Sequence, residues 1–160
     1  MAKFHTLSIA DIYKQTKDCS VITFDVPEAL QSEFQYKQGQ YLTLRTELEG
    51  KEVRRSYSLC SSPIDNKWQV AVKQINGGLF STFANNQLAA GDTLDVMPPH
   101  GTFCTELNPE ASKNYIAFAA GSGITPMLSI IKTHLAKEPK STFKLFYLNS
   151  TVKSIIFKEE

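Results

Sequence analysis

The segment Arg54–Ser58 carries the side chains best suited to holding a charged, planar ligand. A guanidinium binds a phosphate through two parallel hydrogen bonds, and a tyrosine offers a flat ring and a hydroxyl donor. Alternation along a strand would place Arg55 and Tyr57 on one face and the serines on the other. The simpler interpretation is an exposed strand with a surface arginine pair, and this segment alone does not decide between the two.

A second segment that could bind a ligand is Gly77-Gly78-Leu79-Phe80-Ser81, at the start of a predicted helix. Glycines at such a point let a ligand approach the backbone N–H groups at the positive end of the helix. A phosphate suits that environment. A plain hairpin turn with a helix cap explains the same residues.

A third segment, Gly121-Ser122-Gly123-Ile124-Thr125-Pro126, joins an apolar run to a predicted helix. Its order of strand, glycine turn and helix is that of a dinucleotide phosphate-binding turn. Its Gly-x-Gly-x-x-Pro motif differs from the usual Gly-x-Gly-x-x-Gly. It is not a P-loop, because no Gly-Lys-Ser/Thr follows. The alternative is a tight strand-to-helix connection without a ligand.

The elements that position the first two segments are mostly strands, and they occupy residues 1–108. Apolar and polar residues alternate in four runs, which predicts antiparallel strands with one face buried and one face in water. One helix interrupts them over Leu79–Leu88, with Gly91 as its stop. We therefore expect an all-β antiparallel barrel with one helix. The four runs are Val21–Val26, Gln40–Arg45, Trp68–Lys73 and Asp92–Val96.

The character of the sequence changes near Leu107–Glu110, and residues 109–160 read as one βαβ unit of a parallel sheet. The continuous apolar run Tyr115–Ala120 suits a strand covered on both faces. A helix over Met127–Ala136 and a strand over Phe143–Leu148 follow. Ser154–Glu160 is expected to begin a further helix. Because two parallel strands do not make a stable covered sheet, we expect a truncated domain, or completion by a partner.

Composition excludes several classes of function. The formal net charge is +1, so no global charge attracts nucleic acid or a membrane surface. No apolar run approaches the roughly 20 residues that span a bilayer, and the N-terminus lacks an apolar signal region, which predicts a cytoplasmic protein. The three cysteines and three histidines are widely scattered, so no metal site is expected.

The three segments in this order resemble the ferredoxin–NADP reductase superfamily, and the resemblance covers essentially the whole chain. It extends to the branch of phenylacetyl-CoA oxygenase reductase flavoproteins. The residues that carry the likeness to this branch are Phe4-His5-x-Leu7, Thr16-x-Asp18, Ile22-x-Phe24-x-Val26-Pro27, Phe146-Tyr147-x-Asn149 and Ser154-Ile155-Ile156-Phe157.

The resemblance implies a flavin site in the barrel. Arg55 would pair with the FAD pyrophosphate, Tyr57 would stack on the flavin, and Ser58 would hydrogen-bond near flavin N5. One strand would contact the flavin through its backbone, and the first glycine turn would hold the pyrophosphate. These further residues are Val70, Val72, Lys73, Gly77, Gly78, Leu79 and Ser81, while Pro99, Gly101 and Phe103 would close the barrel.

The resemblance also implies a nicotinamide site in the second domain. Its cleft would be lined by Gly121, Ser122, Gly123, Thr125 and Pro126. Thr125 would lie near the flavin, which makes Tyr57, Ser58 and Thr125 the expected catalytic residues. That FAD rather than FMN is the flavin follows from the resemblance alone.

The implied function is an oxidoreductase that takes hydride from NAD(P)H onto FAD and passes electrons to an iron–sulfur centre serving an oxygenase. The chain has no Cys-x4-Cys-x2-Cys run, so the cluster would belong to a missing C-terminal domain. Leu148-Asn149-Ser150 lacks the arginine that many relatives carry here, so the preference between NADH and NADPH stays open. One alternative is a flavin-binding module without reductase activity. Another is a nucleic-acid-binding barrel, although the near-neutral net charge argues against it.

Overall fold

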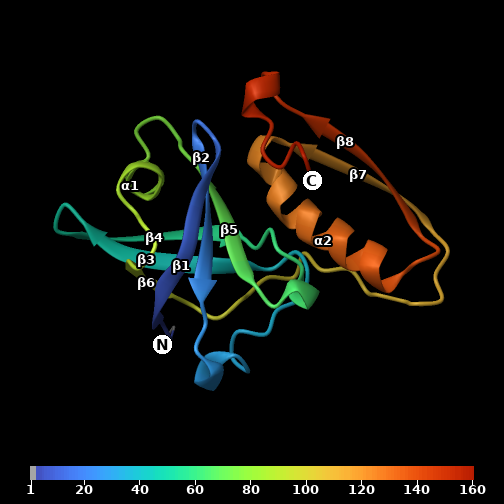
Figure 1. The fold of residues 1–160 in the computed structure, drawn as a ribbon, viewed down its shortest axis with the longest axis horizontal. Helices are drawn as coiled ribbons and strands as arrows, with labels where there is room; N and C mark the ends of the chain where they lie inside the picture. The colour runs from blue at the N-terminus through green and yellow to red at the C-terminus, as the bar shows by residue number, and fades with distance from the viewer. Residues whose placement is uncertain (1–2) are drawn as a thin grey trace.

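The computed structural model describes residues 3–160, and its first part is a six-stranded antiparallel sheet (Figure 1). The strands lie in the order β4-β3-β6-β1-β2-β5. A bridge between Leu59, which follows β4, and Val70, within β5, connects the two edge strands, so the sheet closes into a barrel. The strands are β1 (His5–Thr16), β2 (Cys19–Asp25), β3 (Tyr41–Leu48), β4 (Lys51–Ser58), β5 (Trp68–Lys73) and β6 (Thr93–Val96).

The barrel interior is filled by alternate side chains of these strands and by one helix. That helix, α1 (Leu79–Asn86), inserts Phe80 and Ala84 into the core. It ends two residues before the predicted Leu88, where the N–H groups of Gln87 and Leu88 both reach the carbonyl of Phe83. The barrel with a single helix is as the sequence predicts.

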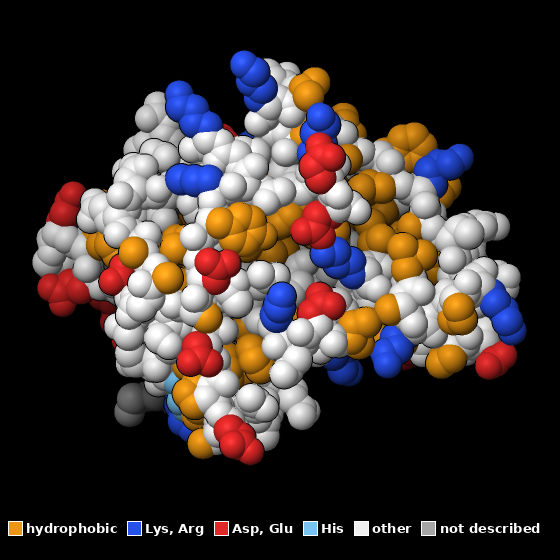
Figure 2. All heavy atoms as spheres, in the orientation of Figure 1, with side chains coloured by type: hydrophobic (Ala, Val, Ile, Leu, Met, Phe, Trp, Pro, Cys, Tyr) orange, Lys and Arg blue, Asp and Glu red, His pale blue; other side chains and the backbone are white. Residues whose placement is uncertain are grey.

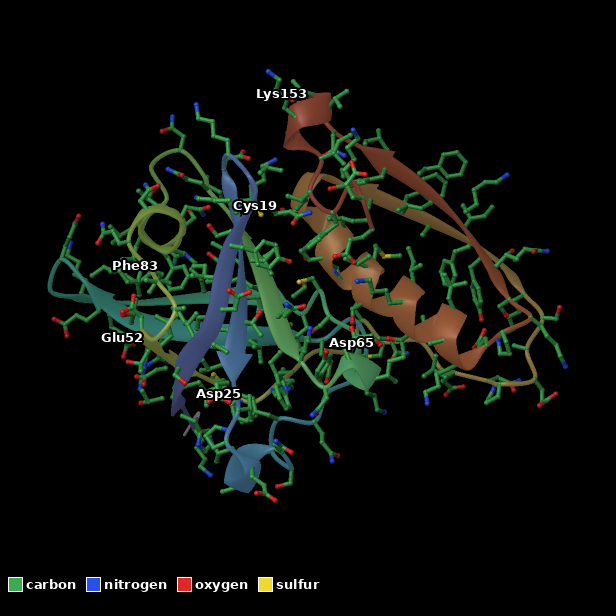
Figure 3. All side chains as sticks on the ribbon, in the orientation of Figure 1. Cys19, Asp25, Glu52, Asp65, Phe83 and Lys153 are labelled. Carbon is green, nitrogen blue, oxygen red and sulfur yellow. The ribbon has the colours of Figure 1, made fainter. Side chains whose placement is uncertain are left out.

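Strand β2 departs from the predicted alternation, because both of its faces are covered. Ile22 and Phe24 point into the barrel, whereas Cys19 and Val21 are buried on the outer side. Figure 3 shows Cys19 on the side of β2 that faces α2 (Ile124–Lys137). The prediction of one solvent-exposed face is wrong for β2, because the second part of the chain packs against that face.

The second part is the expected βαβ unit. Strands β7 (Asn114–Ala120) and β8 (Thr142–Leu148) pair in parallel, and α2 connects them (Figure 1). The prediction that the first strand is covered on both faces is wrong for this chain. Ala117 and Ala119 are buried against α2, but Ile116 is 63% exposed and Phe118 69% exposed, because α2 covers only one face of the pair.

The C-terminal segment forms no α-helix, contrary to the sequence expectation. A 3-10 turn, η4 (Val152–Ser154), is followed by irregular turns. Ile156 and Phe157 are buried there beside Cys19 and Val21. Burial of these two apolar side chains against the barrel outweighs local helix propensity. The other 3-10 turns are η1 (Glu28–Leu30), η2 (Pro63–Asp65) and η3 (Gly121–Gly123).

The two parts share a second apolar cluster and a few polar contacts. The hydroxyls of Ser62 and Thr133 lie 2.7 Å apart across the junction. Gly39 faces the same junction, where a Cβ atom would stand 1.9 Å from the carbonyl oxygen of Phe103. The packing therefore admits no side chain at this glycine. The second cluster comprises Cys19, Val21, Cys60, Ala71, Ala119, Ile124, Leu128, Ile156 and Phe157.

The outer surface carries mixed charge. Figure 2 shows basic and acidic side chains interspersed over one face, with hydrophobic side chains more frequent over the part formed by α2, β7 and β8. No helix among residues 3–160 is long and apolar enough to cross a membrane.

Candidate cofactor site

A cavity of about 530 Å³ opens where β4 and β5 end and α2 begins. One wall comes from the Arg-x-Tyr-Ser strand, and the opposite wall comes from the Gly-Ser-Gly turn. Two segments that lie far apart in the sequence therefore meet, as the resemblance implies. The lining residues are Ser56, Tyr57, Ser58, Ala71, Lys73, Gln74, Ile75, Ser122, Gly123, Thr125 and Pro126.

Tyr57 connects this cavity to the first turn of α1. Its ring centroid lies 5.6 Å from that of Phe80. Burial raises the pKa of Tyr57 to about 12, against a smaller opposing effect of Arg55. The Tyr57 hydroxyl thus stays protonated at neutral pH and can donate a hydrogen bond to a ligand.

The two neighbouring arginines on β4 have different surroundings. Arg54 is held by Glu52, with 2.7 Å between the guanidinium and carboxylate, and it lies over the ring of Phe4. Arg55 is exposed and donates to the backbone carbonyl of Arg54 at 2.7 Å. It does not line the cavity itself, but it lies on the same face of β4 as Tyr57, so it is placed to bind a group extending from the cavity.

The turn before α1 presents backbone donors rather than a free hydroxyl. Ser81 is buried, accepts from the N–H of Ile75 at 3.1 Å and donates to the carbonyl of Gly78 at 3.2 Å. Gly78 is the N-cap and supplies no side-chain cap, so the first N–H groups of the helix have no intrahelical acceptor. Gly77, Gly78, Leu79 and Ser81 lie outside the cavity lining, beyond Ile75.

Strand β5 contributes to the site mainly at its end. Val70 and Val72 are fully buried in the barrel core, so only their backbone is available to a ligand. Lys73 lines the main cavity and also a smaller one of about 290 Å³ at the ends of β7 and β8. Its ammonium group lies 3.9 Å from the carboxylate of Asp18. The two cavities therefore share one cationic residue.

The opposite wall is held by hydrogen bonds within the glycine turn. The Thr125 hydroxyl donates to the carbonyl of Ser122 at 3.0 Å, and the Tyr147 hydroxyl donates to the carbonyl of Gly121 at 2.9 Å. Burial raises the pKa of Tyr147, so this donor stays protonated. Gly121 lines the smaller cavity and not the main one.

Sequence reasoning missed the lining residues Gln74 and Ile75, and it placed Ser56 on the face of its strand opposite Tyr57. Gln74 and Ile75 follow the end of β5 and precede the first glycine turn, a position that itself indicated a ligand contact. Ile75 is a large apolar side chain left exposed at the cavity. Within residues 3–160 no group of three or more His, Cys, Asp or Glu residues is arranged to hold a metal ion.

An antiparallel barrel with one helix, facing a glycine turn of a βαβ unit across a cavity, is the architecture of the flavin-binding part of ferredoxin–NADP reductase-like oxidoreductases. The oxidoreductase FAD-binding domain family matches residues 6–104, and the chain belongs to this family. The fold class, superfamily and flavin cofactor that the sequence predicts are thereby confirmed. The domain boundary at residue 108 stays a prediction.

Known proteins support this assignment. The chain is 45% identical over 159 residues to a component of the 1,2-phenylacetyl-CoA epoxidase of Escherichia coli K12, covering 99% of the chain and 45% of that protein. A phthalate dioxygenase reductase structure aligns with TM-score 0.78 and 30% identity over 96% of the chain and 46% of that structure. A ferredoxin NADP+ reductase from Neisseria gonorrhoeae, with bound FAD and NADP, aligns with TM-score 0.82 and 23% identity over 99% of the chain and 63% of that structure.

The chain thus spans less than half the length of the curated relative, at 45%. The chain is also 38% identical over 156 residues to the ferredoxin reductase component of a 3-ketosteroid-9-alpha-monooxygenase from Rhodococcus rhodochrous, covering 96% of the chain and 43% of that protein. The chain combines an oxidoreductase FAD-binding domain with the βαβ unit that follows it.

Proposed function

We propose that the chain binds FAD with its ring system in the cavity between Tyr57 and Thr125, as part of a reductase that draws on NAD(P)H and supplies electrons to an oxygenase. The observation that carries the proposal is that Tyr57, Ser58 and Thr125 line one cavity of about 530 Å³. When bound, FAD would supply the redox chemistry that converts a two-electron donor into single electrons.

The described residues fit the two chemical parts of such a cofactor. For the ring system, Tyr57 offers an aromatic face and a protonated hydroxyl, and Ser58 offers a second hydroxyl at the cavity wall. For the diphosphate, Arg55 provides a guanidinium, and the first N–H groups of α1 provide donors at the positive helix end.

The electron acceptor we propose is an iron–sulfur centre outside this chain. The phthalate dioxygenase reductase is described as a modular structure for electron transfer from pyridine nucleotides to a 2Fe–2S centre. The E. coli relative is part of a phenylacetyl-CoA epoxidase. By analogy with these, the reductase would serve an oxygenase, and Thr125 and its glycine turn would receive the nicotinamide nucleotide.

The second candidate is a flavin-binding module that this chain forms without reductase activity. The open face of β7 and β8, with Ile116 and Phe118 exposed, supports it because no element among the described residues covers this face of the predicted nucleotide-binding part. In this second candidate the barrel groups, Arg55, Tyr57, Ser58 and the start of α1, would hold the flavin.

A single preparation separates these possibilities. We expect the purified chain to be yellow, with FAD identified by mass after extraction, and to bleach when NADH or NADPH is added without oxygen. A yellow protein that does not bleach would support the module. A colourless protein that takes up no added FAD would contradict both.

A further inference from the structure

A buried polar cluster joins the two parts of the chain at the end of α2 that lies away from the cavity. Glu138 is 0% exposed. Its carboxylate accepts hydrogen bonds from the N–H of Asn108 at 2.9 Å, the Tyr115 hydroxyl at 2.9 Å and the Ser141 hydroxyl at 3.0 Å. A carboxylate out of contact with water is tolerated only when it is satisfied in this way. These donors, the Asn108 N–H foremost, hold the pKa of Glu138 at about 2, so the group is ionised at neutral pH.

His134 extends this cluster toward the barrel. Its Nδ1 lies 3.2 Å from Oε1 of Glu138 without forming a hydrogen bond to it. Its Nε2 lies 2.5 Å from the hydroxyl of Thr105, whose carbonyl accepts from the side-chain amide of Gln38 at 2.6 Å. A chain of contacts thus runs from the barrel, through the connection between β6 and β7, to the last turn of α2.

The same helix reaches the cofactor cavity at its other end. Thr125 and Pro126, in the first turn of α2, line that cavity. Fourteen residues of α-helix span about 21 Å, and a helix of this length moves as a stiff rod. The direction of a rod is set by contacts at separated points. The apolar contacts of Ile124 and Leu128 hold one end, and the Glu138 cluster holds the other.

We propose that Glu138 and His134 are positioning residues: they attach the connection at Thr105 and Asn108 to the last turn of α2, and so hold Thr125 against the Tyr57–Ser58 wall. The inference rests on the proposed function only for the identity of the ligands, FAD and the nicotinamide nucleotide, that bind in the cavity. It concerns residues that touch neither cavity.

Hydrogen exchange followed by mass spectrometry tests this inference without any cofactor. In Glu138→Gln we expect amides of the connection at 105–113 to exchange about tenfold faster, and those of the first turn of α2, at 121–128, several-fold faster, with β1–β3 unchanged. Glu110→Gln is the matched control, because Glu110 is 84% exposed at 3.5 Å from Lys140. It should change none of these rates.

Unchanged exchange at 121–128 in Glu138→Gln would overturn the inference, since it would show a purely local structural role. If that variant does not fold, Tyr115→Phe decides: it removes one donor to Glu138 while keeping the ring that stacks on Phe143 at 4.7 Å. The same pattern in milder form supports the inference, and its absence contradicts it.

Cofactor measurements provide a second readout and separate this inference from the proposed function. Where the chain turns over, Glu138→Gln should alter the rate of nicotinamide oxidation or its KM and leave FAD affinity unchanged, because the proposed FAD contacts lie on the barrel. An equal loss of both would contradict a positioning role. A chain that binds no FAD would remove the proposed function, whereas the exchange result would stand.

Discussion

At the scale of single residues, the site depends on how each side chain is already engaged. Arg54 and Arg55 are chemically identical neighbours, yet of the two only Arg54 forms an ion pair with Glu52. The resemblance predicts Ser81 as a phosphate ligand, but its hydroxyl is engaged in hydrogen bonds within the turn before α1. Residue type therefore identified the candidates, and hydrogen-bond partners distinguish those that remain available.

Arg55→Gln is predicted to weaken FAD binding by roughly 10- to 100-fold, because it removes a charge-assisted contact to the diphosphate. Titration of flavin fluorescence with the apoprotein measures the change in Kd. Arg54→Gln serves as the control and should stay within about threefold of the parent, since an exposed ion pair contributes little. Equal effects of the two substitutions would exclude a specific role for Arg55.

At the scale of elements, the paired strands β7 and β8 are covered on one face only. Phe118 and Phe146 stack on the open face with ring centroids 5.1 Å apart, and both are exposed. An apolar run in the sequence predicts burial, but burial requires a covering layer, which these residues do not include. The strand itself could be predicted from the sequence, and its surroundings could not.

This open face is predicted to bind a hydrophobic dye and to promote self-association. Phe118→Gln should lower both the fluorescence of added 1-anilinonaphthalene-8-sulfonate and the associated fraction in sedimentation velocity. The melting temperature should change little, because the side chain is 69% exposed. Phe103→Gln, at 61% exposure on a different segment, is the comparison. Dye binding that falls equally in both variants would show that the face of β7 and β8 is not responsible.

At the scale of the whole molecule, the barrel and the βαβ unit are joined by an apolar cluster and by the ionised Glu138 cluster. Neither cluster could be predicted from the local pattern of apolar and polar residues. Glu138 lies near the end of a helix with a lysine before it, a setting typical of solvent-exposed residues. Its burial depends on the connection at Asn108 folding over it.

Glu138 is predicted to make stability depend on acid pH. Its pKa is about 2 in the folded chain against an ordinary 4.5, so its stabilisation is complete above about pH 5 and is lost as pH falls from 4.5 toward 2. The melting temperature of Glu138→Gln should therefore lie below that of the parent at pH 7, with the difference shrinking toward pH 2. Thermal melts across this range measure it, with Glu110→Gln as the control. A difference that is the same at every pH would argue against an ionised, stabilised carboxylate.

Local periodicity and turn chemistry predicted most of the strands, the two glycine turns and the helices α1 and α2, because these are local properties. They did not predict β1, and the flavin chemistry of the site followed from the family resemblance. The resemblance, carried by the order of three segments, predicts that Tyr57, Ser58 and Thr125 act at one site. Tertiary contacts were needed to establish that these residues share one cavity, that Ser81 is engaged within its own turn and that Ile156 and Phe157 pack against the barrel instead of starting a helix. Those outcomes depend on contacts between distant segments, whose energies no local stretch of sequence contains.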